Sequence, residues 1–234
     1  MIVVSGGDLV LPARIVTEGA LVIDGGRIAA IESHRVDPAG ATIVDAADCY
    51  VVPGFIDVHV HGLHGHDTLD EGDAVARIAA HLPRYGVTAF CPTTVACPPA
   101  DLRRVLQQVR QMRSTPSAGS ARVLPAHLES NFINPEYRGA QPAACLRTPA
   151  GAHKDGEFAG REVLDVIAAS RPDVGIVTLA PELPGGIDLV RALVASGHRV
   201  SLGHSGADLD TAFAAIDAGA RHATHLFNRM TPMT

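Results

Sequence analysis

The sequence changes character at Val51-Val52-Pro53-Gly54-Phe55-Ile56-Asp57-Val58-His59-Val60-His61. This run is largely apolar, as expected of a strand that is buried on both faces, and it ends on two histidines. Side chains alternate along a strand with a period of two, so His59 and His61 lie on one face. From this run onward, apolar strand-like segments alternate with amphipathic helical ones. That order is typical of βα units on a parallel sheet.

The region 51–234 is therefore predicted to be an α/β domain. Strands are expected at 51–60, 87–92, 122–129, 174–180, 199–204 and 222–227, with helices near 73–84, 100–113, 159–170, 187–196 and 207–218. Polar residues at the carboxyl ends of the strands favour a (β/α)8 TIM-like barrel, which carries its catalytic groups at that face. Each βα unit here takes about 30 residues, so eight would need about 240. We therefore expect an incomplete barrel, with two strands beyond Thr234.

Residues 1–50 are predicted to form a separate small β domain. The segments 20–23 and 27–31 flank Asp24-Gly25-Gly26, and 41–45 is a further short strand. Glycines supply the positive φ angles that tight hairpin turns need, so this pattern predicts a hairpin.

Five residues at or near strand ends have side chains that bind metals. A lone His-x-His motif is more often a pair of ordinary histidines, although two neutral imidazoles are half of a divalent-metal site. Three further such residues follow equivalent strands, and together they favour a metal centre made of His59, His61, Glu129, His204 and His225.

Five segments then carry a resemblance to a known family. The segment 53–62 resembles the first-strand motif of the amidohydrolase superfamily. Four more resemble N-acetylglucosamine-6-phosphate deacetylases: Gly86-Val87-Thr88-Ala89-Phe90-Cys91-Pro92-Thr93-Thr94, His127-Leu128-Glu129 with Asn134-Pro135 and Gly139-Ala140, Leu202-Gly203-His204-Ser205, and Ala223-Thr224-His225-Leu226-Phe227-Asn228. The resemblance implies an incomplete barrel of the metal-dependent hydrolase type, and a β-sandwich portion in residues 1–50.

The resemblance also implies roles for single residues. Glu129, His204 and His225 would hold the principal divalent ion, zinc or iron, and His59 and His61 would hold a second. Asn228 would help to bind the sugar phosphate, and Gln141 stands where many members have a histidine that contacts substrate. Arg229 replaces a small residue of the family.

The implied reaction is hydrolysis of the acetamide of N-acetylglucosamine 6-phosphate to glucosamine 6-phosphate and acetate, in amino-sugar catabolism. The family's general acid/base is an aspartate after the eighth strand, which is expected beyond Thr234, so the catalytic acid/base in this chain is unknown. Related enzymes bridge two metals with a carboxylated lysine. The one lysine here, Lys154, lies in a glycine-rich loop, and a bridging Glu129 is the better interpretation.

Two alternatives stay open at this point. The chain is then either an inactive fragment or pseudo-enzyme that binds metal or a partner, or an amidohydrolase that acts on another amide. An incomplete barrel leaves sheet edges unpaired, so the chain alone is expected to be nearly inactive and to associate, with a second copy or with a missing C-terminal half.

Composition excludes other classes of function. The formal net charge is −6, with no basic stripe, which argues against nucleic acid as a partner. No run of 18 apolar residues and no signal peptide is visible, so no membrane association is expected. The four cysteines show no Cys-x-x-Cys spacing, which favours a reducing cytoplasm.

Overall fold

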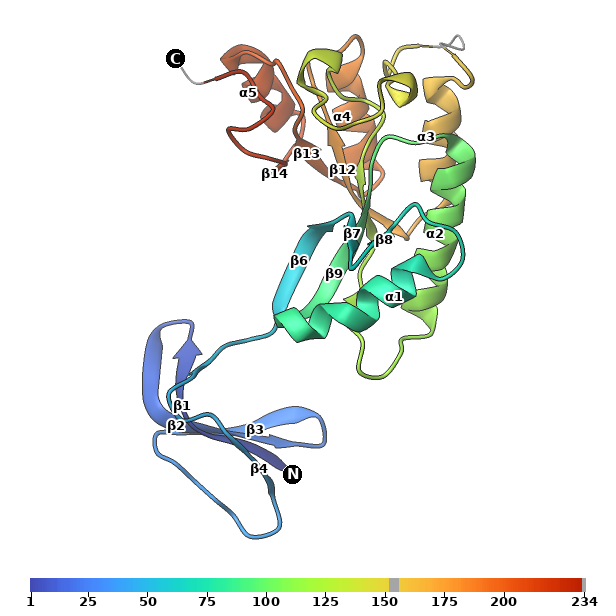
Figure 1. Cartoon of the computed structure of the whole chain (residues 1–234). Helices are drawn as coiled ribbons and strands as arrows, with labels where there is room; N and C mark the ends of the chain where they lie inside the picture. Colours follow the sequence, from blue (N-terminus) through green and yellow to red (C-terminus); the bar gives the residue numbers. More distant parts are fainter. Residues whose placement is uncertain (152–155, 233–234) are drawn as a thin grey trace. The chain divides into compact units, whose positions relative to one another are not determined.

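The structure is a computed structural model that describes residues 1–151 and 156–232, so Lys154 lies outside the described residues. The chain divides into two compact units, Met1–Gly54 and Phe55–Thr234 (Figure 1). Each unit is built around its own sheet, as the change in sequence pattern predicts.

The first unit is one mixed sheet in which β1 (Ile2–Leu11) is central. Two antiparallel hairpins join β1, β2 (Arg14–Asp24) and β3 (Arg27–Glu32), and the predicted turn places Gly25 and Gly26 at φ +56° and +74°. The strands β4 (Thr42–Asp45) and β5 (Tyr50–Val51) run parallel to β1.

The expected strand 51–60 is in fact two strands. Tyr50 and Val51 pair with Asp8 and Leu9 of β1, whereas β6 (Phe55–Val60) belongs to the second sheet. Proline has no N–H to offer a ladder, so Pro53-Gly54 interrupts the pairing. The boundary between the units therefore falls after Gly54 rather than after residue 50.

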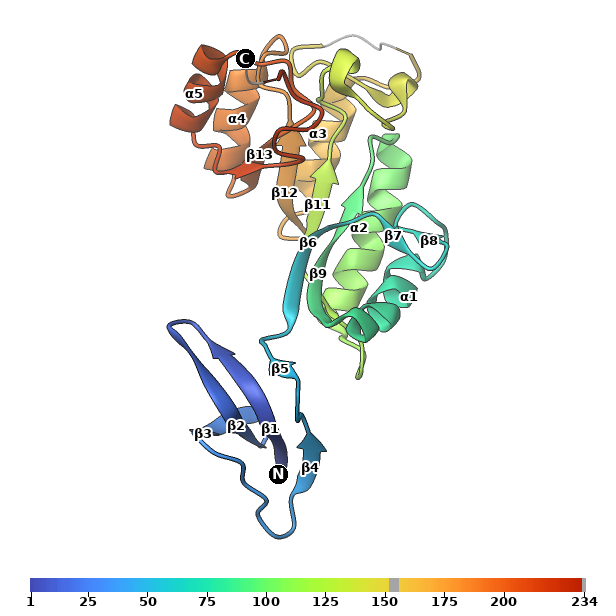
Figure 2. The same cartoon turned by 60° about the vertical axis from the view of Figure 1, so that its left-hand side comes forward.

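The second unit is an incomplete parallel barrel. Neighbouring strands follow the order of the chain: β6, β9 (Val87–Thr94), β11 (Ala126–Glu129), β12 (Val174–Leu179), β13 (Arg199–Leu202) and β14 (His222–Ala223). The short strand β10 (Arg122–Val123) precedes β11 and pairs with the same strand, β9. All six expected strand positions are occupied. Within the described residues, β6 and β14 each pair with one neighbour, so the curled sheet is open (Figure 2).

Five helices connect these strands, at the expected places. They are α1 (Ala74–His81), α2 (Pro99–Ser114), α3 (Gly160–Ala169), α4 (Gly186–Ala195) and α5 (Leu209–Asp217). Shorter elements are β7 (Gly62–Leu63), β8 (His66–Asp67) and the 3-10 turns η1 (Leu82–Tyr85), η2 (Pro135–Tyr137) and η3 (Ala143–Cys145). Parallel crossovers are right-handed, so a sheet whose strands follow chain order carries its helices on one face.

The two faces of this sheet bury different chemistry. The core between sheet and helices is apolar and includes Ile78, Phe90, Val105, Leu128, Val163 and Val177. Along β11 and β12 the alternate residues His127, Glu129 and Thr178 are buried and polar. A period of two thus sends Leu128 into the core and its neighbours to the opposite, concave face. No described helix is long and apolar enough to cross a membrane.

Candidate metal centre

The five metal-binding residues expected from the sequence lie at one edge of the sheet. His59 lies near the end of β6 and His61 follows it; Glu129 ends β11; His204 and His225 each lie two residues beyond the end of β13 and β14. Parallel strands present their carboxyl ends at the same edge, and for this reason residues far apart in sequence come together.

The buried carboxylate of Glu129 is the centre of this cluster. Its Oε1 lies 2.7 Å from Nε2 of His225 and 2.8 Å from Nε2 of His204. Nε2 of His61 lies 3.2 Å from Oε2, and Nε2 of His59 lies 3.8 Å from Oε1 and 3.0 Å from Nε2 of His61. Two groups therefore have their ligand atoms within 4.8 Å of one another: His59-His61-Glu129 and Glu129-His204-His225.

This donor set fits a divalent metal. Four imidazole nitrogens and one carboxylate point at a common region, and these are ligand types that zinc and iron accept. Burial lowers the pKa of His59 to about 4, with the neighbouring His127 acting in the same direction, so His59 is neutral at pH 7. Burial raises the pKa of Glu129, but hydrogen bonds from His204 and His61 outweigh it and hold that pKa well below its usual range. The carboxylate is therefore ionised.

The orientation of His204 is fixed from behind. Its Nδ1 lies 2.7 Å from the carbonyl oxygen of Tyr137, which can only accept, so Nδ1 keeps a proton, and the proton that Nε2 donates to Glu129 is the one that a metal would displace. The N–H of Asn134 donates to the carbonyl of His204 at 2.9 Å. Such partners behind a histidine set its tautomer and its angle to a metal. The loop after Glu129, aperiodic in sequence, thus supports the site.

The backbone around His204 is also held in an unusual conformation. His204 and His225 have φ angles of +50° and +54°, in the left-handed region that L-residues rarely adopt. The carboxylate of Glu182 holds the turn after His204, since it accepts from the hydroxyl of Ser205 at 2.7 Å and from the N–H of Gly206 at 2.6 Å. Sequence reasoning missed Glu182; a carboxylate two positions after the strand expected at 174–180 was its one visible signal.

The two residues expected to bind substrate differ in position. Gln141 is buried; its amide donates to Oε2 of Glu129 and its oxygen accepts from the N–H of Ala96 at 2.7 Å. In this structure its side chain therefore holds the carboxylate. Asn228 is exposed, and its N–H donates to the carbonyl of His225 at 2.6 Å. The substrate contacts of both residues stay predictions.

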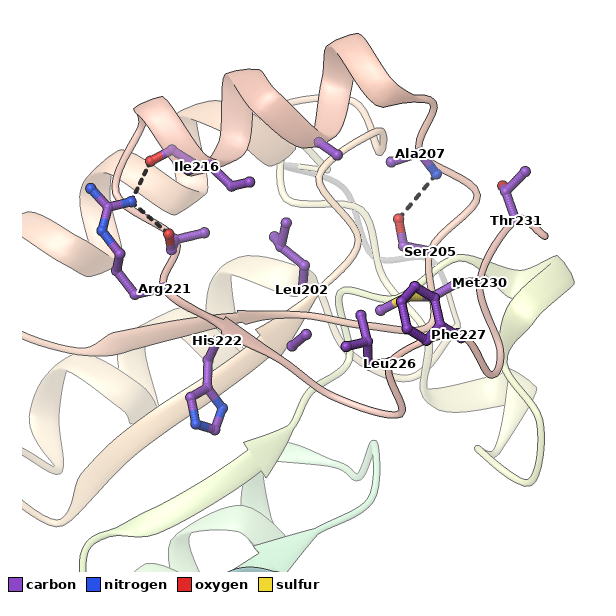
Figure 3. A pocket seen from close by; sticks show the side chains of 13 residues that line it. Leu202, Ser205, Ala207, Ile216, Arg221, His222, Leu226, Phe227, Met230 and Thr231 are labelled. Atoms are coloured by element: carbon purple, nitrogen blue, oxygen red, sulfur yellow. Dashed lines mark hydrogen bonds between the residues drawn. The ribbon is translucent and has the colours of Figure 1, made fainter. Parts of the chain in front are cut away.

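A separate apolar hollow of about 530 Å³ lies beside α5 and β14 (Figure 3). The side chains of Leu202, Ile216 and Met230 line it, and Leu226 and Phe227 border it with more than half of their surface exposed. Its lining includes none of the five candidate metal ligands. The hollow therefore belongs to the open edge of the sheet and not to the metal centre.

Comparison with known proteins finds relatives in the family that the sequence segments resemble. No family model matches the sequence. N-acetylglucosamine-6-phosphate deacetylase of Rattus norvegicus is 44% identical over 194 residues, which cover 80% of this chain and 45% of the rat protein. N-acetylgalactosamine-6-phosphate deacetylase of Escherichia coli O157:H7 is 36% identical over 212 residues, 90% of this chain and 52% of that protein.

The fold agrees with these relatives. A structure of N-acetyl-D-glucosamine-6-phosphate deacetylase from Mycobacterium smegmatis, in complex with N-acetyl-D-glucosamine-6-phosphate, superposes with a TM-score of 0.83 at 30% identity. That match covers 100% of this chain and 57% of the other. The chain spans about half the length of the curated relatives it matches. The chain belongs to the N-acetylglucosamine-6-phosphate deacetylase family and corresponds to an N-terminal portion of its members.

Proposed function

We propose that the chain carries the divalent-metal centre of an enzyme that hydrolyses the acetamide of N-acetylglucosamine 6-phosphate to glucosamine 6-phosphate and acetate. The observation that carries this proposal is the convergence of four imidazoles on the buried Glu129 at the carboxyl edge of a parallel sheet. The named activity of the relatives supports the substrate class. It favours this function over an inactive fragment and over another amide substrate.

Each residue has a role in the proposal. Glu129, His204 and His225 hold the principal ion, zinc or iron, while His59 and His61 join Glu129 around a second. A divalent ion polarises an amide carbonyl and acidifies water at neutral pH. Glu129 supplies the negative charge, and the Tyr137 carbonyl keeps His204 in the tautomer that leaves Nε2 for the metal. Asn228 and Gln141 are proposed to contact the sugar phosphate.

Amide hydrolysis also needs a group that moves a proton to the leaving nitrogen. The two metal-binding groups in the described residues contain only histidines and Glu129. Asp208, which follows His204 closely in sequence, caps α5 by accepting from the N–H of Thr211 at 2.8 Å. We therefore assign the proton transfer to no residue of this chain, and binding is a better first test than turnover.

The test is a calorimetric titration of the zinc- or iron-loaded chain with N-acetylglucosamine 6-phosphate, beside an acetate-release assay. Binding that requires both the metal and the 6-phosphate supports the proposal. Equal binding of unphosphorylated N-acetylglucosamine would remove the sugar-phosphate assignment. N-acetylgalactosamine 6-phosphate is included because one relative is named for that epimer. A chain that binds metal but no sugar phosphate would restore the alternatives.

Location and association are proposed on separate grounds. Four free cysteines support a reducing cytoplasm. The unpaired edge of β14 and the apolar hollow beside it support association with a second copy or with the remaining barrel strands. Size-exclusion chromatography with light scattering tests this, and a monodisperse monomer at high concentration would contradict it.

A further inference from the structure

The end of β6, which carries His59 and leads directly to His61, is held by side chains rather than by regular pairing. Its ladder with β9 pairs Asp57 with Phe90 and then skips to Val60, which pairs with Pro92. A proline has no N–H to donate. Across this irregularity the N–H of His59 donates to the carboxylate of Asp57 at 3.0 Å, and the N–H of Val60 donates to the hydroxyl of Thr93 at 2.9 Å.

The carbonyl of Val58, in the middle of this irregular stretch, accepts from His127 instead. Nδ1 of His127 lies 2.8 Å from that oxygen, although His127 belongs to β11 and β9 lies between β11 and β6 in the sheet. The histidine therefore reaches across the concave face. Its ring also packs edge-on against His59, with the ring centroids 4.9 Å apart. With 1% of its surface exposed, His127 is fully buried at this contact.

The other side of His127 is held by a chain of buried hydroxyls. Nε2 of His127 lies 2.7 Å from the hydroxyl of Thr178, which lies 2.8 Å from that of Thr224, which lies 2.7 Å from that of Ser201. The direction of these hydrogen bonds follows from the Val58 carbonyl on the far side of His127. A carbonyl only accepts, so Nδ1 carries the proton, Nε2 of the neutral ring accepts from Thr178, and each hydroxyl accepts from the next.

Two of these residues lie close to the metal-binding ones in sequence. His127 lies two positions before Glu129 on β11, and Thr224 immediately precedes His225. We propose that His127 is a positioning residue of the metal centre, whose bond to the Val58 carbonyl places His59 and His61 opposite Glu129. The hydroxyl chain satisfies Nε2 of this tautomer and holds the ring from its other side. The inference rests on the proposed metal site and adds a residue that binds no metal itself.

The first measurement needs no metal. In the metal-free chain, ¹⁵N-edited NMR of the histidine rings is expected to show His127 as the Nδ1–H tautomer with a slowly exchanging proton. Thr178→Val removes the hydroxyl that donates to Nε2 and should make the Nδ1 proton exchange faster, because the ring is then held from one side alone, whereas Thr178→Ser should keep it slow. An Nε2–H tautomer in the wild-type chain would overturn the proposal.

The second measurement is Co²⁺ binding, followed by calorimetry and by the electronic spectrum of the cobalt. His127→Leu is expected to weaken Co²⁺ binding at the site that contains His59 and His61 by about 10- to 100-fold, as is typical for partners behind a metal ligand. His61→Ala removes binding at the same site. The double variant His127→Leu/His61→Ala should therefore bind Co²⁺ no more weakly than His61→Ala alone. His127→Asn, whose amide can still donate to Val58, should recover most of the affinity. Far-UV circular dichroism shows whether each variant folds.

The outcomes separate the two proposals. If the wild-type chain binds Co²⁺ and His127→Leu binds it equally well with the same spectrum, the positioning role is wrong and the metal site stands. If the wild-type chain binds no Co²⁺, both proposals fall. If His127→Leu does not fold, His127→Asn and Thr178→Val carry the test, and full affinity in Thr178→Val together with an unchanged exchange rate of the Nδ1 proton would contradict the role of the hydroxyl chain.

Discussion

Replacing Glu129 by glutamine is the sharpest test of the metal centre. The change keeps the volume of a side chain that is 2% exposed but removes the one negative charge on which four imidazoles converge. Loss of a partner behind a metal ligand typically costs 10- to 100-fold in affinity, and loss of a ligand itself costs more. Zinc should therefore bind more than about 100-fold more weakly, which corresponds to about 2.7 kcal/mol.

Competition with a chromophoric chelator measures this affinity, and elemental analysis after gel filtration measures the zinc retained. Glu136→Gln makes the same chemical change at an exposed position seven residues away, and it should bind zinc like the wild-type chain. A Glu129→Gln chain that binds zinc within about threefold of wild type would refute the reasoning. Glu129 would then be a structural carboxylate that only accepts hydrogen bonds from the surrounding histidines.

Further predictions concern the stability of the metal-free chain. Burial lowers the pKa of His127 from 6.5 to about 4, so the unfolded chain takes up a proton first as the pH falls. The contribution of the neutral His127 ring to the free energy of unfolding is therefore fully present above about pH 6.5. It is lost as the pH falls towards 4, by on the order of 3 kcal/mol. Urea midpoints at pH 7.5 and 5 should fall further for wild type than for His127→Asn, and equal falls would contradict this. Glu182→Gln should lower the unfolding free energy by about 1–3 kcal/mol, because an amide group then faces backbone and hydroxyl donors; an unchanged urea midpoint argues against it. Phe90→Ala should cost about 3–5 kcal/mol and the half-exposed Phe213→Ala less than about 1 kcal/mol, and similar losses in thermal melts would mean that the core is misassigned.

Much of the fold, and the grouping of the candidate metal ligands, is predictable from local pattern. The alternation of apolar runs and amphipathic helices places every strand of the open barrel, since both periods are visible in short windows. His59, Glu129, His204 and His225 then converge for a topological reason, because parallel strands end at one edge. No contact between distant residues had to be guessed.

The parts that could not be predicted depend on distant contacts. Gln141 lies in an aperiodic loop, and its place beside Glu129 depends on the N–H of Ala96, 45 residues earlier. Thr178 and Thr224 are ordinary residues for a strand, and their hydrogen bond exists because the register of β12, β13 and β14 makes them neighbours. Register across a sheet is not written in any single strand.

The left-handed backbone at His204 and His225 has a consequence for how such a chain would change under selection. An L-residue in this region costs roughly 1–2 kcal/mol relative to glycine, which adopts it freely. Glycine at either position would therefore relax the turn and remove a proposed metal ligand in the same step. Selection for thermal tolerance alone would favour glycine at both positions. Selection for a bound metal would retain the histidines in spite of their cost in stability. In an evolution experiment on this chain, the amino acid found at position 204 would report which of the two pressures had acted.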